Sequence, residues 1–176
     1  MEKIYTVFFP NQLIAGLGAV EKIGEKAKDL GKSNALIITD KGIVKAGLLE
    51  KVLTPLEKAG LKAHIFDQIE PNPRDHTVNK AYEFGKKKDA DLIIGLGGGS
   101  PIDAAKAVGI LMTNPGPLTD YLRGTVLKNP VPTLIAIPTT AGTGNKMERP
   151  CTRAASRLAI YTASLSAARL PTPPRI

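Results

Sequence analysis

The chain has 176 residues, of which 43% are hydrophobic and 23% charged, with 17 glycines, no tryptophan and a net charge of +8. This composition is typical of a globular α/β protein, long enough for one core, and excludes a fibrous or disordered chain. No basic segment precedes a long apolar run at the N-terminus, and no run approaches the ~18 residues of a membrane span. With a single cysteine, Cys151, these features predict a cytoplasmic protein without a membrane anchor.

The positive charge is unevenly distributed along the chain. Residues 145–176 contain six basic residues and one acidic residue, whereas lysines and acidic residues are interspersed through the body of the chain. Interspersed charges are typical of solvated helix faces, and the basic tail lacks the interleaved aromatic residues of a nucleic-acid platform. We therefore expect no nucleic-acid partner.

Short apolar runs alternate with amphipathic stretches, which predicts alternating strands and helices. In chain order the expected elements are strand 4–9, helix 18–31, strand 35–39, helix 43–58, strand 61–66, helix 76–88, strand 91–97, helix 101–113 and strand 131–138. Pro55 is expected to bend or divide the second helix, and Asp75 to cap the third.

This order of elements predicts an α/β, Rossmann-like fold, with helices on both faces of a mostly parallel sheet. Continuous apolar runs such as ALIIT (35–39) are typical of strands buried on both faces. Ligands bind to such sheets outside the carboxyl ends of the strands. Three informative stretches follow predicted strand ends, namely Asp40, the glycine run after Leu96, and TTAGTG (139–144).

The glycine run GGGSP (97–101) joins a predicted buried strand to a helix. A helix N-terminus offers unpaired N–H groups and a partial positive charge, so it binds anions where the backbone can approach them. Glycines remove the side chains that would block this approach. Ser100 is expected to cap the helix or to donate its hydroxyl to a phosphate, with Pro101 at the first helical position. The stretch therefore predicts a phosphate-binding loop.

The spacing of the glycines differs from two well-known phosphate motifs. G95-x-G97-x-x-S100 lacks the last glycine of the dinucleotide fingerprint, and no G-K-[ST] sequence marks a P-loop. A ligand-free tight turn is the alternative interpretation. Lys106, seven residues beyond Gly99, is more simply a solvated helix residue than a phosphate ligand.

Four motifs in the same order resemble the iron-containing (group III metal-dependent) alcohol dehydrogenases. These motifs are TDKG (39–42), PNP (71–73), GGGSPIDAAK (97–106) and IPTTAGTG (137–144). The resemblance covers residues 1–144 and implies a dinucleotide-binding domain related to the N-terminal domain of the dehydroquinate synthase-like fold. The family reaction it implies is hydride transfer between an alcohol and a nicotinamide cofactor.

The resemblance also implies roles for individual residues. Gly98, Gly99 and Ser100, within the loop that starts at Gly97, would hold the pyrophosphate of the cofactor. The residues implied to form the rest of the cofactor cleft are Thr139 and Thr140 on the adenosine side, with Asn72, Asp103 and Thr143. Threonine hydroxyls and an asparagine amide are suitable partners for ribose and adenine.

Asp40 has two possible roles. Its carboxylate can accept a hydrogen bond from the adenine ribose 2′-OH and would repel a 2′-phosphate, which favours NAD over NADP, although NADP stays possible. The alternative is a plain N-cap for the following helix.

Beyond Gly144 the sequence departs from the family pattern, since Asn145 and Lys146 stand where the family has Ser-Glu. All 17 glycines precede this point, and arginine replaces lysine as the main basic residue after it. We interpret residues 145–176 as a divergent tail, the product of a frameshift or truncation, with a natural extension as the alternative. Residues 153–170 could pack as a helix or a strand, or the surface left exposed could drive homo-oligomer formation.

The family holds iron or zinc through an aspartate and three histidines of a second, helical domain, which is expected to be absent here. His64 and His76 lack metal-ligand spacing and are expected to be structural or solvent-exposed. We therefore expect two segments, a dinucleotide-binding domain (1–144) and a tail (145–176). The chain is expected to bind NAD but no metal, and to show little alcohol dehydrogenase activity alone. The alternative function is a stand-alone nucleotide-binding or self-association module without redox activity.

Overall fold

The computed structural model describes residues 12–114, 116–122 and 127–140, and the backbone of 158–162. The helices are the 3₁₀ turn η1 (Ala19–Lys22), α1 (Ile23–Asp29), α2 (Lys41–Lys45), α3 (Glu50–Lys58), α4 (Asp75–Lys87), α5 (Gly99–Thr113) and α6 (Leu118–Leu122). The strands are β1 (Gln12–Gly16), β2 (Asn34–Ile38), β3 (Lys62–Phe66), β4 (Leu92–Gly97), β5 (Leu134–Pro138) and β6 (Leu158–Thr162).

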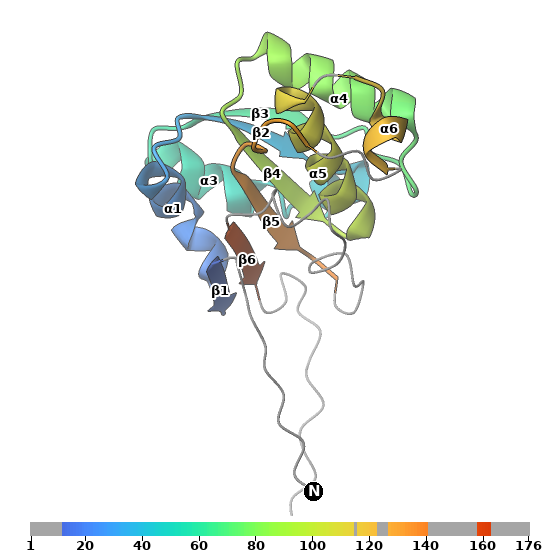
Figure 1. Cartoon of the computed structure of the whole chain (residues 1–176). Helices are drawn as coiled ribbons and strands as arrows, with labels where there is room; N and C mark the ends of the chain where they lie inside the picture. Colours follow the sequence, from blue (N-terminus) through green and yellow to red (C-terminus); the bar gives the residue numbers. More distant parts are fainter. Residues whose placement is uncertain (1–11, 115, 123–126, 141–157, 163–176) are drawn as a thin grey trace, which may run out of the picture.

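The six strands form one sheet in the order β1-β6-β5-β4-β2-β3, and every neighbouring pair is parallel. Figure 1 shows helices packed on both sides of this sheet. The structure therefore confirms the predicted α/β fold with a parallel, doubly covered sheet.

Alternate side chains of the central strands enter two separate cores. Ile37, Ile94 and Ile135 pack with η1, α1 and α3 on one face, whereas Ile38 and Ile93 pack with α4 and α5 on the other. Because both faces are buried, these strands are apolar throughout, which is why their sequences predict a parallel sheet.

Strands β1 and β6 are the two strands whose bounds the sequence did not predict. The predicted strand 4–9 falls outside the described residues, and the first described strand is β1, at residues 12–16. β6 comes from the segment 153–170, for which helix and strand were both open, and it lies between β1 and β5. The strand alternative is therefore confirmed for residues 158–162.

The helix predicted over residues 43–58 is divided, although not by Pro55. The break separates α2 from α3 and contains Gly47, whose φ of 68° is left-handed, whereas Pro55 lies inside α3. A glycine with positive φ ends a helix, so Gly47 and not the proline sets the division.

The predicted cap of α4 is also wrong. Arg74 is the N-cap residue, without a side-chain cap bond, and Asp75 is already the first helical residue. Glu70 accepts hydrogen bonds there instead, from the N–H of Arg74 at 3.2 Å and from the Thr77 hydroxyl at 2.7 Å. A carboxylate from the preceding turn therefore satisfies the start of this helix.

Candidate functional site

The carboxyl ends of β2, β4 and β5 meet at one edge of the sheet. The Thr39 hydroxyl donates to the Leu96 carbonyl at 2.8 Å, and the Thr139 N–H donates to the Gly97 carbonyl at 2.9 Å. These bonds fix the residues that follow each strand, and they bring the three predicted stretches together at this edge, as far as Thr140.

Replacing Thr39 with valine is expected to lower the free energy of unfolding by about 1–2 kcal/mol, because a buried carbonyl loses its hydroxyl donor. Thr39 is fully buried, whereas Thr54 on α3 is exposed. Thr54→Val is therefore a matched control that should change stability by less than about 0.5 kcal/mol. Urea unfolding of both variants measures the difference, and equal costs would show that the Thr39 bond contributes nothing.

The glycine turn uses two of its glycines in different ways. Gly97 has a φ of 142°, and a Cβ there would lie 2.8 Å from the Pro101 Cγ, so the backbone itself requires glycine. Gly98 has an ordinary φ of −76°, and the nearest atom to a Cβ there would be the Thr140 Oγ1 at 3.6 Å. The fold therefore has room for a side chain at Gly98, and glycine leaves that space open.

Helix α5 begins directly after this space. Gly98 is its N-cap residue and makes no side-chain cap bond, and the helix runs for 15 residues. Its first N–H groups therefore face the open side of the turn with the positive end of the helix dipole. This arrangement suits a phosphate group.

Ser100 and Pro101 lie deeper in the helix than the sequence predicts. Ser100 is the second residue of α5 and Pro101 the third, so neither the cap nor the first helical position is occupied as expected. The Ser100 Oγ instead accepts a hydrogen bond from the N–H of Asn72 at 3.2 Å. Asn72 has a φ of 53°, which turns its N–H toward the helix start and explains why a residue tolerant of left-handed backbone stands there.

The two interpretations of Asp40 are compatible in the structure. Its Oδ1 accepts from the Ile43 N–H at 3.0 Å, which confirms that Asp40 caps α2. Its Oδ2 lies on the side of the glycine turn, 3.4 Å from where a Cβ of Gly97 would stand. One oxygen therefore stabilises the helix while the other faces the turn.

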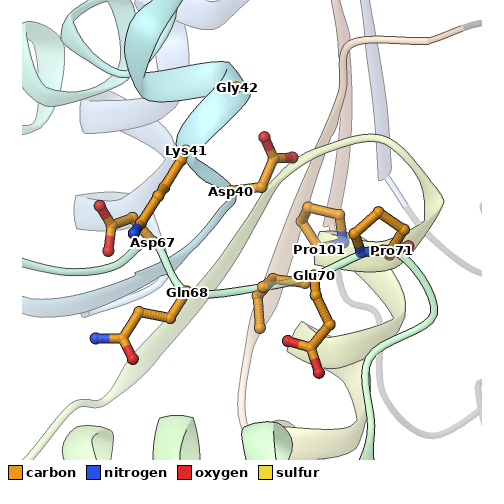
Figure 2. A pocket seen from close by; sticks show the side chains of 10 residues that line it. Asp40, Lys41, Gly42, Asp67, Gln68, Glu70, Pro71 and Pro101 are labelled. Atoms are coloured by element: carbon orange, nitrogen blue, oxygen red, sulfur yellow. The ribbon is translucent and has the colours of Figure 1, made fainter.

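A cleft of about 860 Å³ opens beside these groups. Its lining residues are Asp40, Lys41, Gly42, Asp67, Gln68, Ile69, Glu70, Pro71, Ser100 and Pro101. Figure 2 shows that they come from the start of α2, the segment after β3 and the start of α5. The volume is in the range of small-molecule sites, and three carboxylates against one lysine make the lining acidic.

Asp67, Gln68 and Glu70 are cleft residues that the sequence analysis missed. They follow the carboxyl end of β3, so the strand-end rule that identified Asp40 would also have found them. The hydrogen bond from Thr77, followed by those from the backbone N–H groups of Glu70 and Arg74, lowers the pKa of the Glu70 carboxyl. Its carboxylate is therefore ionised at neutral pH.

Those of the remaining predicted residues that the structure describes lie around the turn and not in the cleft lining. Asp103 is exposed one helical turn beyond Gly99, and its Oδ1 lies 3.4 Å from the Lys106 Nζ. Lys106 is only 8% exposed, so its interpretation as a solvated residue is wrong. Thr143 lies outside the described residues.

The histidines do not converge on a common site. His64 is half-buried in β3, where burial, followed by the charges of Lys88 and Lys62, lowers its pKa. His76 is exposed at the start of α4. Across the described part of the chain no three metal-ligating side chains gather. The described residues therefore do not offer the set of one aspartate and three histidines that the resemblance implies for the family's metal.

Among the helices that the structure describes, none combines the length and apolar character needed to cross a membrane.

Comparisons with known proteins converge on one family. The family model for "Iron-containing alcohol dehydrogenase" matches residues 10–165, a range that continues past Gly144 into the segment of β6. The chain is 40% identical over 151 residues to 1,3-propanediol dehydrogenase of Citrobacter freundii, covering 85% of the chain and 39% of that protein. It is 35% identical over 164 residues to NAD-dependent methanol dehydrogenase of Bacillus methanolicus, covering 93% and 41%.

The solved structures agree. A crystal structure of 1,3-propanediol oxidoreductase superimposes with a TM-score of 0.81 at 33% identity, covering 91% of this chain and 46% of that one. The chain thus spans less than half the length of the relatives it matches. On the match over residues 10–165, the chain belongs to the iron-containing alcohol dehydrogenase family.

Proposed function

We propose that this chain supplies the NAD-binding half of an alcohol oxidoreductase. One observation carries the proposal: the turn at Gly98 leaves open space directly before the uncapped N-terminus of the 15-residue helix α5. Such a turn accommodates a pyrophosphate, because backbone N–H groups can reach its oxygens without an intervening side chain. A matching relative, the methanol dehydrogenase, is NAD-dependent by name, which supports this choice of cofactor.

The described residues divide the dinucleotide between two places. Gly98, Gly99 and the Ser100 hydroxyl would bind the pyrophosphate at the start of α5. The adenosine would occupy the acidic cleft, where the Asp40 Oδ2 accepts from a ribose hydroxyl. Thr139 and Thr140, which follow β5 beside the turn, would contact the cofactor from the opposite side.

The acidic lining favours NAD over NADP. A 2′-phosphate placed near Asp40 would meet the carboxylates of Asp67 and Glu70 in the same cleft. Repulsion between like charges makes this arrangement costly, whereas a neutral 2′-OH can donate to Asp40.

When bound, the nicotinamide ring would take a hydride from the carbinol carbon of an alcohol, or give one to the carbonyl carbon of the oxidised product. The residues of this chain bind and orient the dinucleotide that carries the ring. The two relatives described above are dehydrogenases of 1,3-propanediol and of methanol by name, so we propose an alcohol as the class of substrate for the whole protein.

Calorimetric titration of the full chain with NAD, NADP and ADP tests the proposal. We expect saturable binding of NAD and ADP and weaker binding of NADP. Absence of heat and of thermal stabilisation at millimolar NAD would contradict it. Equal affinities for NAD and ADP would support the alternative of a nucleotide-binding module. Alcohol-dependent NAD reduction, measured in parallel, checks the prediction that this chain alone has little activity. A cytoplasmic location and self-association also stay predictions.

Replacing Asp40 with serine is expected to reduce the preference for NAD over NADP by roughly tenfold, because the ribose acceptor loses its charge. Serine remains a good N-cap, so the stability of α2 should change little. Glu57→Gln is the matched control, since it removes an exposed carboxylate of α3 that does not line the cleft. An unchanged preference in Asp40→Ser would show that the ribose lies elsewhere.

A further inference from the structure

The turn between β3 and α4 is exposed in its middle and anchored at both ends. Ile69 and Thr77 are buried, whereas Pro71, Asn72 and Arg74 between them are exposed. An exposed turn of this length has little packing of its own to fix its conformation. Its position depends on the bonds that span it.

Glu70 provides these bonds. One carboxylate oxygen, Oε1, accepts both from the Arg74 N–H at 3.2 Å and from the Thr77 hydroxyl at 2.7 Å. The first bond closes the turn across four residues, and the second ties the carboxylate to a buried side chain of α4. Bonds to an ionised carboxylate are stronger than neutral ones, so this closure is well suited to holding an exposed turn.

The closed turn delivers one N–H to the cofactor site. The Asn72 N–H, oriented by its φ of 53°, donates to the Ser100 Oγ at 3.2 Å. A hydroxyl that accepts one hydrogen bond still has its own proton to donate. With an oxygen lone pair engaged by Asn72, the direction in which Ser100 can donate is restricted, and Ser100 lies at the helix end proposed to bind phosphate.

We propose that Glu70 and Thr77 form a positioning pair: by closing the 70–77 turn they hold the Asn72 N–H against Ser100 and so aim the Ser100 hydroxyl at the cofactor phosphate. The inference rests on the proposed function. Neither residue touches the phosphate in this arrangement, since both act through Asn72 and Ser100.

Four single variants test the pair. Glu70→Ala and Thr77→Val remove the acceptor and the donor, whereas Glu70→Gln and Thr77→Ser keep an oxygen in place. Each is titrated with NAD, ADP and adenosine, and its melting temperature is recorded. We expect the first two to weaken NAD and ADP binding by about five- to tenfold. Thr77→Val, which lies outside the cleft lining, should leave adenosine binding within about twofold. Glu70→Gln and Thr77→Ser should stay within about twofold of the unmodified protein.

A double-mutant cycle separates positioning from general damage to the turn. Ser100→Ala removes the hydroxyl that the pair is proposed to aim, so adding Glu70→Ala to it should change NAD affinity by less than about twofold. Glu83→Ala, which removes an exposed carboxylate from α4, controls for the change in charge.

Two outcomes would overturn the inference. One is an effect of Glu70→Ala that persists undiminished with Ser100→Ala, and the other is a loss of adenosine binding in Thr77→Val equal to its loss of NAD binding. Both presuppose that the unmodified chain binds NAD. If it does not, the proposed function itself fails, and the two failures are thereby distinguished. Thr77→Val keeps the test available should Glu70→Ala not fold.

Discussion

Replacing Gly24 with alanine is expected to lower the free energy of unfolding by about 3 kcal/mol or more. The added Cβ would lie 2.1 Å from the carbonyl oxygen of Pro55 and 2.7 Å from the Cβ of Ala59. Both atoms belong to α3 or its C-cap, and α1 packs directly on this helix. A backbone carbonyl cannot rotate away as a side chain can, so the two helices must separate and the core between them loosens.

Intrinsic helix propensity predicts the opposite sign for this substitution. Gly24 lies inside α1, where alanine is favoured over glycine by about 1 kcal/mol. A fall of roughly 10 °C in the melting temperature would therefore show that packing outweighs propensity.

Gly31→Ala separates the clash from the cost of backbone strain. Gly31 follows α1, has a φ of 68°, and has no atom within 4 Å of a Cβ placed there. It should cost about 1–2 kcal/mol, from the left-handed backbone alone. Urea unfolding of both variants measures the difference, and a Gly24→Ala protein no less stable than Gly31→Ala would contradict the close helix contact.

Local sequence predicts the central sheet because the apolar runs that indicate its strands result directly from the burial of those strands. Strands β2, β4 and β5 are buried on both faces, and their unbroken apolar runs follow directly from that burial. The glycine turn was predictable as a tight turn at a strand end, although Gly97 is required by its backbone and Gly98 only leaves space open before α5. Asp40 was predictable as both cap and candidate ligand, because both roles follow from its position after β2.

The details that failed depend on contacts distant in sequence. The start of α4 is satisfied by Glu70 and not by Asp75, and Ser100 pairs with Asn72, 28 residues away, instead of capping α5. Lys106 is buried because most of α5 is buried, including Ala104, Ala105 and Val108 around it. For residues 153–170 the sequence left a helix and a strand open, and only the folded sheet specifies that residues 158–162 pair between β1 and β5.

The largest functional effect is expected at Gly98. Replacing it with alanine or serine should weaken NAD binding at least tenfold, because any Cβ there enters the space before α5 that the pyrophosphate would occupy. The fold itself should tolerate both changes, since the backbone of Gly98 is in an ordinary region and, among the described residues, the nearest atom to the new Cβ is the Thr140 Oγ1 at 3.6 Å.

Gly98→Ser is a stricter test of this prediction than Gly98→Ala, because the two residues differ as N-caps. Alanine is a poorer N-cap than glycine and can cost up to about 1 kcal/mol, whereas serine is a preferred cap. Because Pro101, the third residue of α5, has no N–H, the new hydroxyl would accept from the N–H of Ser100. Gly98→Ser should therefore keep or raise the melting temperature while it occupies an N–H group that a phosphate needs. Stability and cofactor affinity would then change in opposite directions, which a merely damaged protein cannot show.

Titration with NAD, ADP and adenosine shows which part of the cofactor the Gly98 variants no longer bind. Loss of NAD and ADP binding with adenosine binding retained would place the defect at the phosphates, since the Asp40 side of the cleft is untouched by the substitution. If Gly98→Ser binds NAD as the unmodified chain does, the space before α5 holds no phosphate, and the glycine there serves neither the fold nor the cofactor.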